Sequence, residues 1–348
     1  MKIAILGDTH FGCRGDLKIF HDYFEKFYVQ YFFPKLKELG VDNIIQLGDL
    51  FDRRKFMNFY TLSECKRYFF DHLGDMKFDT LVGNHDIYWR ESLEVNSSSL
   101  VLGEYPNVHV HTKPTTMFLD DGTTVDIIPW ICKENEQEIH DFINKSKSEI
   151  CVGHFEIAGF AMYRGMEAHE GIDGNLFSKY ELVLSGHYHT RSKKENIVYA
   201  GVPYEMTWSD YNDPKGFHIF DTETRELTFI ENPYTIFARF EYDDTKELVD
   251  LDSLDLKDCF VRLIVVNKTD YYKFDKFINK LYSKGCYEIK IVEDLSEFSD
   301  GEVGEDINLE DTLSVLSNYI DSIETEADTE KIKTFMKSLY IEAVNVEI

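Results

Sequence analysis

The chain has 348 residues, of which 43% are hydrophobic, and its 27 Phe and 21 Tyr exclude global disorder. No stretch approaches the roughly 18 consecutive apolar residues of a membrane span, and the N-terminus lacks the features of a secretory signal. The formal net charge of −27 opposes DNA binding, because DNA affinity comes largely from Lys and Arg. Residues 293–348 hold 16 Asp/Glu and 3 Lys, a net of −13, which leaves only −14 for residues 1–292.

The six cysteines form no C-x-x-C pair and have no regular spacing. This pattern argues against a disulfide framework and against a thiolate zinc site. We therefore expect reduced cysteines, most of them in the core, in a cytoplasmic protein with no membrane association.

Seven short aliphatic runs in the first two thirds of the chain predict buried strands. They cover residues 3–6, 44–47, 80–82, 125–128, 150–152, 182–184 and 197–199. Helical patterns lie between them, notably at 17–39 and 60–73, so the alternation indicates an α/β fold. A strand pair at 217–221 and 226–230, joined by a turn, precedes Asn232-Pro233, where we place the exit from the first domain, 1–235.

Residues 236–293 predict a second, small α/β domain, which we call the cap. It has a strand at 260–266, a helix at 271–283 stopped by Gly285, and a strand at 287–292. Five residues of the helix share an apolar face: Tyr271, Phe274, Ile278, Leu281 and Tyr282. Four lysines form a stripe on the opposite face: Lys273, Lys276, Lys280 and Lys284. The stripe could contact DNA, although a solvated face is the commoner use of such residues.

The C-terminal region begins with an acidic stretch, 294–307, that predicts a flexible linker. Two amphipathic helical patterns follow in 308–348, the second with Asp328 as N-cap. Their apolar stripes are Leu309, Leu313, Leu316, Ile320 and Ile323, and then Ile332, Phe335, Met336, Leu339, Tyr340 and Ala343. A hairpin of this size barely folds alone, so we expect it to dock on a partner; the alternative is packing on its own globule.

Five short polar motifs follow predicted strands. They are Asp8-Thr9-His10, Gly48-Asp49-Leu50-Phe51-Asp52, Gly83-Asn84-His85-Asp86, Gly153-His154, and Gly186-His187-Tyr188-His189. Each alone is typical of an ordinary turn, cap or structural histidine. Together they supply the nitrogen and oxygen ligands that suit Mn, Fe or Zn, and residues two apart on extended chain point to the same side. Glycines before the ligands allow the backbone to approach closely.

This order of motifs resembles the calcineurin-like metallophosphoesterases, and more closely the SbcD-type nucleases of the Mre/Rad double-strand-break repair complexes. The compact chain is most similar to the phage recombination endonuclease subunits of that group. The resemblance implies a four-layer α/β/β/α sandwich with a small α/β cap and a C-terminal helical hairpin. It also implies the cytoplasm of a bacterium or of a phage-infected host.

The resemblance implies two divalent cations, with Mn²⁺ favoured and Mg²⁺ as the alternative. One cation would bind Asp8, His10, Asp49 and His189, and the other Asn84, His154, His187 and the same, bridging Asp49. His85 resembles the family's general acid. Asp52 departs from the cellular Mre nucleases, which often have histidine there; we expect its carboxylate to bond His85 and fix the imidazole tautomer. Asp86 is expected to support the site, or to cap a helix.

Basic residues follow the motifs although the chain as a whole is acidic. A local group of positive charges at the edge of a site can bind phosphate. Our DNA-contact candidates are Arg53 first, then Arg14, Arg54, Lys55, Arg191 and Lys193, with Arg90 and Lys194 nearby. For any one of them, a solvated surface charge is as good an interpretation.

The favoured function is two-metal hydrolysis of DNA ends, single strands or hairpins, in complex with an SbcC/Rad-type ATPase that docks on 308–348. The resemblance further implies a homodimer through the nuclease domain. The first alternative is a phosphoprotein phosphatase or small-molecule phosphodiesterase, since the same metal core serves those reactions. The second, of a different class, is a DNA-end tethering scaffold with a vestigial metal site.

Overall fold

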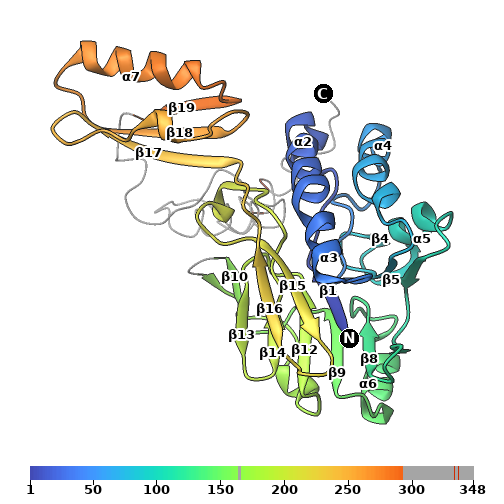
Figure 1. Ribbon diagram of the computed structural model, residues 1–348. Coiled ribbons are helices and arrows are strands. Elements are labelled where there is room, and N and C mark those ends of the chain that lie inside the picture. The colour runs from blue at the N-terminus through green and yellow to red at the C-terminus, as the bar shows by residue number, and fades with distance from the viewer. Residues whose placement is uncertain (164–165, 293–332, 334–335, 337–348) are drawn as a thin grey trace. The chain divides into compact units, whose positions relative to one another are not determined.

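The computed structural model describes residues 1–163, 166–292, 333 and 336. Its main body contains two six-stranded sheets (Figure 1). The first has the order β16 (Leu227–Glu231), β15 (Gly216–Asp221), β1 (Lys2–Leu6), β2 (Asn43–Gln46), β3 (Lys77–Leu81) and β6 (Val108–His111). The second has the order β13 (Ser192–Lys194), β14 (Ile197–Tyr199), β12 (Leu182–Gly186), β9 (Ile150–His154), β8 (Thr124–Ile128) and β7 (Thr115–Phe118). Four adjacent strands of each sheet run parallel to one another: β1, β2, β3 and the edge strand β6 in the first, and β8, β9, β12 and β14 in the second.

The alternation of side chains along the strands builds the layers. Ile3 and Ile5 of β1 lie in the apolar core between the sheets, together with Val152 of β9. Ala4 and Leu6 point the other way, into a second core formed with the helices. On the second sheet, helix α6 (Glu136–Lys145) packs against Cys151 and Val183 through the buried residues Ile139 and Ile143. These cores give the helix, sheet, sheet, helix order that the resemblance implied.

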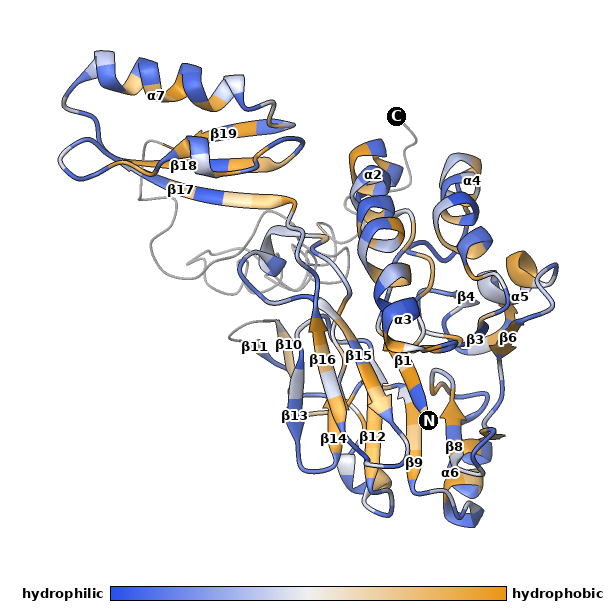
Figure 2. Ribbon diagram, viewed as in Figure 1, coloured by the Kyte–Doolittle hydropathy of each residue, from blue (hydrophilic) through white to orange (hydrophobic). Residues whose placement is uncertain are grey.

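The helices on the first sheet follow the predicted segments, with one irregularity. The segment predicted at 17–39 consists of α2 (Lys18–Phe27), a π-helical turn (Tyr28–Phe32) and α3 (Phe33–Leu39). Pro34, which has no amide hydrogen to donate, follows the π turn. The other predicted helix is α4 (Phe59–Tyr68) with a 3₁₀ turn (Phe70–His72). In Figure 2, α2 and α4 carry both hydrophilic and hydrophobic colours, as expected of helices that cover a sheet.

Several elements were not predicted by residue range. The short ones are α1 (Cys13–Asp16), the hairpin β4 (Ile87–Trp89) and β5 (Ser92–Asn96), α5 (Ser97–Leu102), β6, β7, β10 (Ala161–Tyr163), β11 (Met166–Glu167), β13 and three 3₁₀ turns (Gly174–Phe177, Trp208–Asp210 and Leu251–Ser253). Each of these is too short for its periodicity to be recognised in the sequence. Two longer elements also had no predicted range: helix α6 and strand β17 (Phe237–Asp243).

The cap is a three-stranded parallel sheet covered by one helix. Its order is β17 (Phe237–Asp243), β18 (Phe260–Asn267) and β19 (Glu288–Val292), and its helix is α7 (Tyr271–Ser283). The predicted helix has the correct bounds, but its apolar face was partly wrong. Phe274, Phe277 and Leu281 are buried, whereas Tyr271 and Tyr282 are exposed.

The lysine stripe of α7 divides into two parts. Lys280 and Lys284 form ion pairs with Asp252, at 2.7 and 3.7 Å. Lys276 instead lies over the ring of the exposed Tyr272, with 4.5 Å between its Nζ and the ring centroid. The two lysines at the C-terminal end of the stripe, Lys280 and Lys284, are therefore paired with a carboxylate of the cap. Lys276, one turn earlier in the helix, lies beside an exposed aromatic ring instead.

The predicted acidic linker and C-terminal hairpin lie outside the described residues, and the domain limits stay predictions. No helix in the described part of the chain is long and apolar enough to cross a membrane. All six cysteines are free and five of them are buried, as expected.

Candidate metal centre

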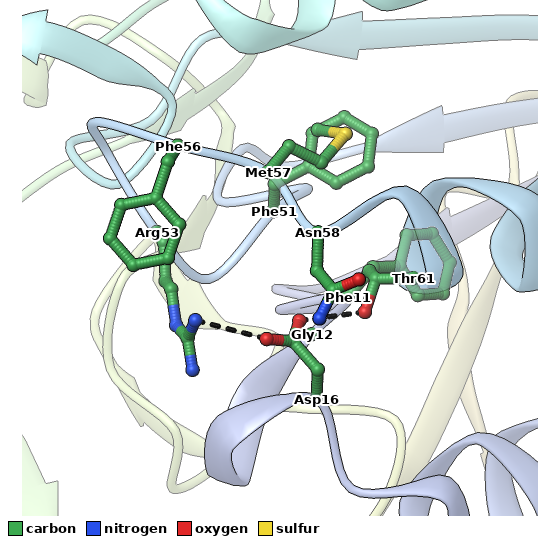
Figure 3. A pocket seen from close by; sticks show the side chains of 9 residues that line it. All are labelled: Phe11, Gly12, Asp16, Phe51, Arg53, Phe56, Met57, Asn58 and Thr61. Carbon is green, nitrogen blue, oxygen red and sulfur yellow. Dashed lines mark hydrogen bonds and ion pairs between the residues drawn. The ribbon is translucent and has the colours of Figure 1, made fainter. Parts of the chain in front are cut away.

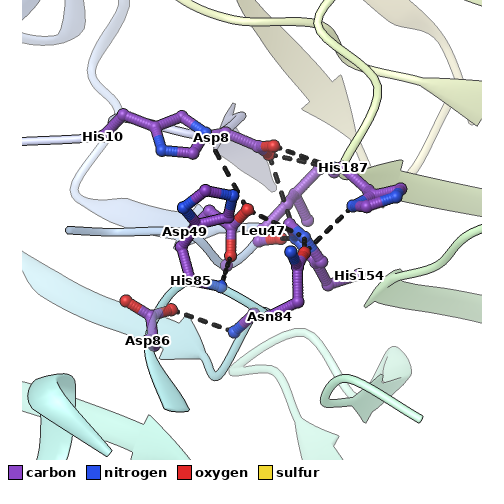
Figure 4. A network of polar contacts seen from close by, with 12 residues as sticks. Asp8, His10, Leu47, Asp49, Asn84, His85, Asp86, His154 and His187 are labelled. Carbon is purple, nitrogen blue, oxygen red and sulfur yellow. Dashed lines mark hydrogen bonds and ion pairs between the residues drawn. The ribbon is translucent and has the colours of Figure 1, made fainter. Parts of the chain in front are cut away.

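The predicted ligands lie at the carboxyl ends of parallel strands from both sheets. Asp8, Asp49 and Asn84 follow β1, β2 and β3 of the first sheet. His154 ends β9, and His187 follows β12 of the second sheet. Because the carboxyl ends of parallel strands share one edge of a sheet, the two edges bring these side chains together (Figure 4).

The first group of ligands contains Asp8, His10 and His189, whose potential ligand atoms lie within 4.8 Å of one another. The Nε2 atoms of His10 and His189 face each other at 3.2 Å. Asp49 completes this group, because its Oδ2 lies 3.8 Å from His10 Nε2.

The second group contains Asp49, His154 and His187. His154 Nε2 lies 3.2 Å from Asp49 Oδ2, the same oxygen that faces His10. Asn84 joins this group through its Oδ1, which lies 2.9 Å from His154 Nε2 and 3.0 Å from His187 Nδ1. The seven predicted ligands therefore form two groups, with Asp49 between them.

The hydrogen bonding of His154 tests whether a cation fits. Its Nδ1 donates to the carbonyl oxygen of Leu47 at 2.7 Å, so in the neutral ring Nε2 carries a lone pair. That lone pair faces two oxygens, Asp49 Oδ2 and Asn84 Oδ1. Three acceptors that converge need either an extra proton or a cation, and nitrogen with oxygen is the donor set of Mn²⁺ and Zn²⁺ sites. The residues thus fit two divalent cations.

The backbone of the motifs is tightly constrained. A Cβ at Gly83 would lie 2.2 Å from Asp49 Oδ1, so only glycine fits there. Three ligand residues adopt the left-handed region that most side chains avoid: His10 with φ 41°, Asp49 with φ 51° and His187 with φ 89°. Such conformations concentrate at functional sites, where the surrounding structure holds them in place.

His85 and Asp52 are neighbours, but not through the atoms predicted. His85 Nδ1 donates to the main-chain carbonyl oxygen of Asp52 at 2.7 Å. The Asp52 carboxylate lies instead 3.3 Å from Nδ1 of His10, whose Nε2 faces the first ligand group. The expected bond between the Asp52 carboxylate and His85 was therefore wrong. Asp52 is arranged as the carboxylate that orients a metal-binding histidine.

Residues 1–191, more than half of the chain, match the family model for calcineurin-like phosphoesterases. The chain belongs to that family. This phosphoesterase is 34% identical to exonuclease subunit 1 of Enterobacteria phage T4 over 99% of both chains. It is 28% identical to the SbcD component of the nuclease SbcCD of Staphylococcus saprophyticus over 26% of each chain. A solved archaeal phosphodiesterase shares 15% identity and a TM-score of 0.35, covering 66% of this chain and 99% of that one, a likeness too distant to bear on function.

Two further side chains, outside the predicted ligand set, hold the loops of the phosphoesterase together. The buried Asp86 carboxylate accepts hydrogen bonds from the amides of Gly83 and Leu50, at 2.9 and 3.1 Å, and so joins the second and third motifs. Asp86 thus supports the site, as expected. The buried Lys215 donates to the carbonyl oxygen of His189 at 3.0 Å and pairs with Asp210 at 2.8 Å. Sequence reasoning missed Lys215, because it lies 26 residues from the ligand that it contacts.

Burial and charge shift the pKa values of the ligands in opposite directions. Burial raises the pKa of Asp8 to about 7. Burial alone would lower the pKa of His10 and of His154, but nearby carboxylates, Asp52 for the first and Asp49 for the second, raise both to about 9. Burial lowers the pKa of His189 to about 3. Without cations, carboxylates and protonated imidazoles therefore balance each other in this centre.

Trp130 forms one wall of the second ligand group and was not predicted. Its ring centroid lies 5.2 Å from that of His187 and 5.9 Å from that of His154. The residue follows β8, a parallel strand of the second sheet, after one proline. Trp130 thus has the same kind of sequence position as the ligands, just after a parallel strand. That position would have indicated Trp130 as a residue of the site if aromatic side chains were counted with the polar ones.

The predicted DNA-contact residues have mixed surroundings. Arg53 pairs with Asp16 at 2.9 Å and lies over the ring of Phe56 at one side of a small pocket (Figure 3). Arg191 is half-buried and stacks on Phe229 at 3.5 Å, so it packs within the protein. Three of the others are exposed: Arg14, Lys55 and Lys193. Arg54 is half-buried.

Proposed function

We propose that this phosphoesterase cleaves DNA at two divalent cations, as the nuclease subunit of a double-strand-break repair and recombination complex. The observation that carries the proposal is the Asp49 carboxylate, one oxygen of which faces His10 in the first ligand group and His154 in the second. The similarity to a phage exonuclease subunit over the full length supports DNA as the substrate.

The ligand groups define which residues would hold each cation. Asp8, His10 and His189 would hold the first, Asn84, His154 and His187 the second, and Asp49 both. When bound, the two cations would lower the pKa of a water, hold the phosphate oxygens and neutralise developing charge. We propose Mn²⁺ as the physiological cation, with Mg²⁺ as the alternative, because imidazole ligands suit Mn²⁺ better.

His85 is the proposed general acid. Its Nδ1 proton is held by the Asp52 carbonyl oxygen, so Nε2 is the atom left to donate a proton to the leaving oxygen. The His85 ring meets the His10 ring edge-on, with 4.8 Å between the centroids, which places it beside the first ligand group. The His85 amide donates to Asp49 Oδ1 at 2.7 Å and ties the acid to the bridging ligand.

The net charge makes a partner necessary for strong DNA binding. An acidic chain repels DNA phosphates, so we propose that an SbcC/Rad-type ATPase, docked on residues 308–348, supplies much of the DNA affinity. Arg53 would change from Asp16 to a DNA phosphate when the substrate is bound, because its guanidinium is partly exposed.

We also propose a homodimer through α4 and α5. Phe59 at the start of α4 is 87% exposed, and Leu100 of α5 is 75% exposed. An ion pair between Lys66 of α4 and Glu104, two residues after α5, links the two segments. Two large apolar side chains exposed to this degree are typical of a subunit interface. Light scattering checks this proposal, since Leu100→Asp would convert the dimer to a monomer and Phe118→Ala would not.

The test is Mn²⁺-dependent release of nucleotides from linear DNA, compared with a small phosphodiester and a phosphopeptide. The proposal expects DNA cleavage that chelation stops and that His85→Ala reduces about 100-fold or more. Turnover of only the small diester or the phosphopeptide would favour the phosphatase alternative. Binding of DNA ends without any turnover would favour the tethering scaffold.

A further inference from the structure

The β4–β5 hairpin presents two aromatic rings to solvent. Tyr88 is 43% exposed and Trp89 is 50% exposed, although both belong to a strand whose first residue, Ile87, is fully buried. The two rings meet edge-on with 5.2 Å between their centroids. Large aromatic side chains that gather on a surface are typical of binding sites, because water solvates their faces poorly.

The hairpin that carries the rings is firmly held. Ile87 and Leu93 lie in an apolar cluster with Val82 and Cys132. The Leu93 amide donates to the Glu134 carboxylate at 3.1 Å. The rings are therefore displayed by a rigid element, so a partner would meet them without first ordering a loop.

The same cluster connects the hairpin to the metal centre. Trp130 packs against it and also forms the wall beside His187. Trp89 lies four residues after His85, which limits the distance between their Cα atoms to about 14 Å. At the duplex rise of about 3.4 Å per nucleotide, this separation corresponds to about four nucleotides, so the hairpin lies within a few nucleotides of His85.

We infer that Tyr88 and Trp89 stack on unpaired bases of the DNA strand whose phosphate lies at the metal centre. The inference rests on the proposed function and adds that the substrate is single-stranded next to the cleaved bond. Stacking needs a free base face, which an intact duplex hides. Stacking is also independent of phosphate charge, so it suits a chain with a net charge of −27.

The experiment measures binding of the full-length protein to a fluorescein-labelled twelve-nucleotide oligothymidine and to a duplex of equal length, at low salt with Mn²⁺. All proteins carry His85→Ala, which keeps the cation ligands and slows cleavage during the measurement. Trp89→Ala should weaken binding of the single strand about 10-fold, and Trp89→Phe should recover most of it, because the ring is retained. Duplex binding should not change. Phe118→Ala, which removes an exposed ring on β7, is the matched control and should change neither.

Two further readouts make the result decisive. The salt dependence of single-strand binding should keep its slope in Trp89→Ala, because no phosphate contact is lost. Thermal unfolding and Mn²⁺ binding should match the wild type. Unchanged single-strand affinity, an equal loss for strand and duplex, or a changed oligomeric state would each overturn the inference. A wild-type protein that cleaves no DNA when Mn²⁺ and the ATPase partner are supplied would instead overturn the proposed function.

Discussion

The replacement Asp52→Asn separates two roles for this residue. Asparagine has the same shape but no charge, so it weakens the contact between side chain 52 and Nδ1 of His10. The main-chain carbonyl of residue 52, which accepts the His85 hydrogen bond, is untouched. Loss of a carboxylate behind a metal-binding histidine typically lowers metal affinity about 10- to 100-fold, equivalent to about 1.4–2.8 kcal/mol.

We therefore expect Asp52→Asn to bind Mn²⁺ at least about 10-fold more weakly, while kcat at saturating Mn²⁺ stays within about 3-fold of the wild type. Titration calorimetry measures the affinity, and DNA cleavage across a Mn²⁺ series measures kcat. Arg53→Gln, a change at the next residue, is the control for affinity. An unchanged Mn²⁺ affinity with a large fall in kcat would refute this reasoning, because Asp52 would then act through His85.

Three further predictions concern protons and packing. His10 and His154, with pKa values raised to about 9, hold protons at pH 7, and Asp8, with a pKa of about 7, is about half protonated there. Mn²⁺ binding should therefore release about two to three protons and tighten as pH rises; calorimetry in two buffers counts the protons, and no release would contradict this. Gly83→Ala should weaken Mn²⁺ binding at least about 10-fold in a folded protein by circular dichroism, because the Cβ would meet Asp49; wild-type affinity would count against it. Burial raises the pKa of Glu205 from 4.5 to about 7. The native state then holds the proton more tightly, so stability should fall by about 3 kcal/mol as pH rises through that window, and Glu205→Gln should flatten the urea-unfolding profile, whereas a profile equal to the wild type would refute the assignment.

Much of the site could be predicted, because short buried strands that end in polar residues are visible in a sequence. The strand expected at 44–47 is β2 (Asn43–Gln46), and Asp49 follows it as expected. Parallel strands bring their carboxyl ends to one edge, so the convergence of Asp8, Asp49 and Asn84 follows from strand order alone.

The remaining features depend on contacts that spacing does not encode. His85 donates its hydrogen bond to the main-chain oxygen of Asp52. Every residue has such an oxygen, so the residue type at position 52 does not indicate this bond. The carboxylate of Asp52 therefore led to the wrong partner for His85. In α7, Tyr282 continues the apolar stripe by position, but the polar tip of tyrosine tolerates water and Phe277 takes the buried place. Lys215 contacts the carbonyl oxygen of His189 only in the folded chain, so no local sequence pattern connects the two residues.

Electron paramagnetic resonance of the Mn²⁺-loaded protein tests most directly whether Asp49 bridges two cations. We expect two Mn²⁺ per chain with an exchange-coupled spectrum, and loss of the coupling in Asp49→Asn. A single Mn²⁺ per chain, or two that give an uncoupled spectrum, would contradict the two-metal centre.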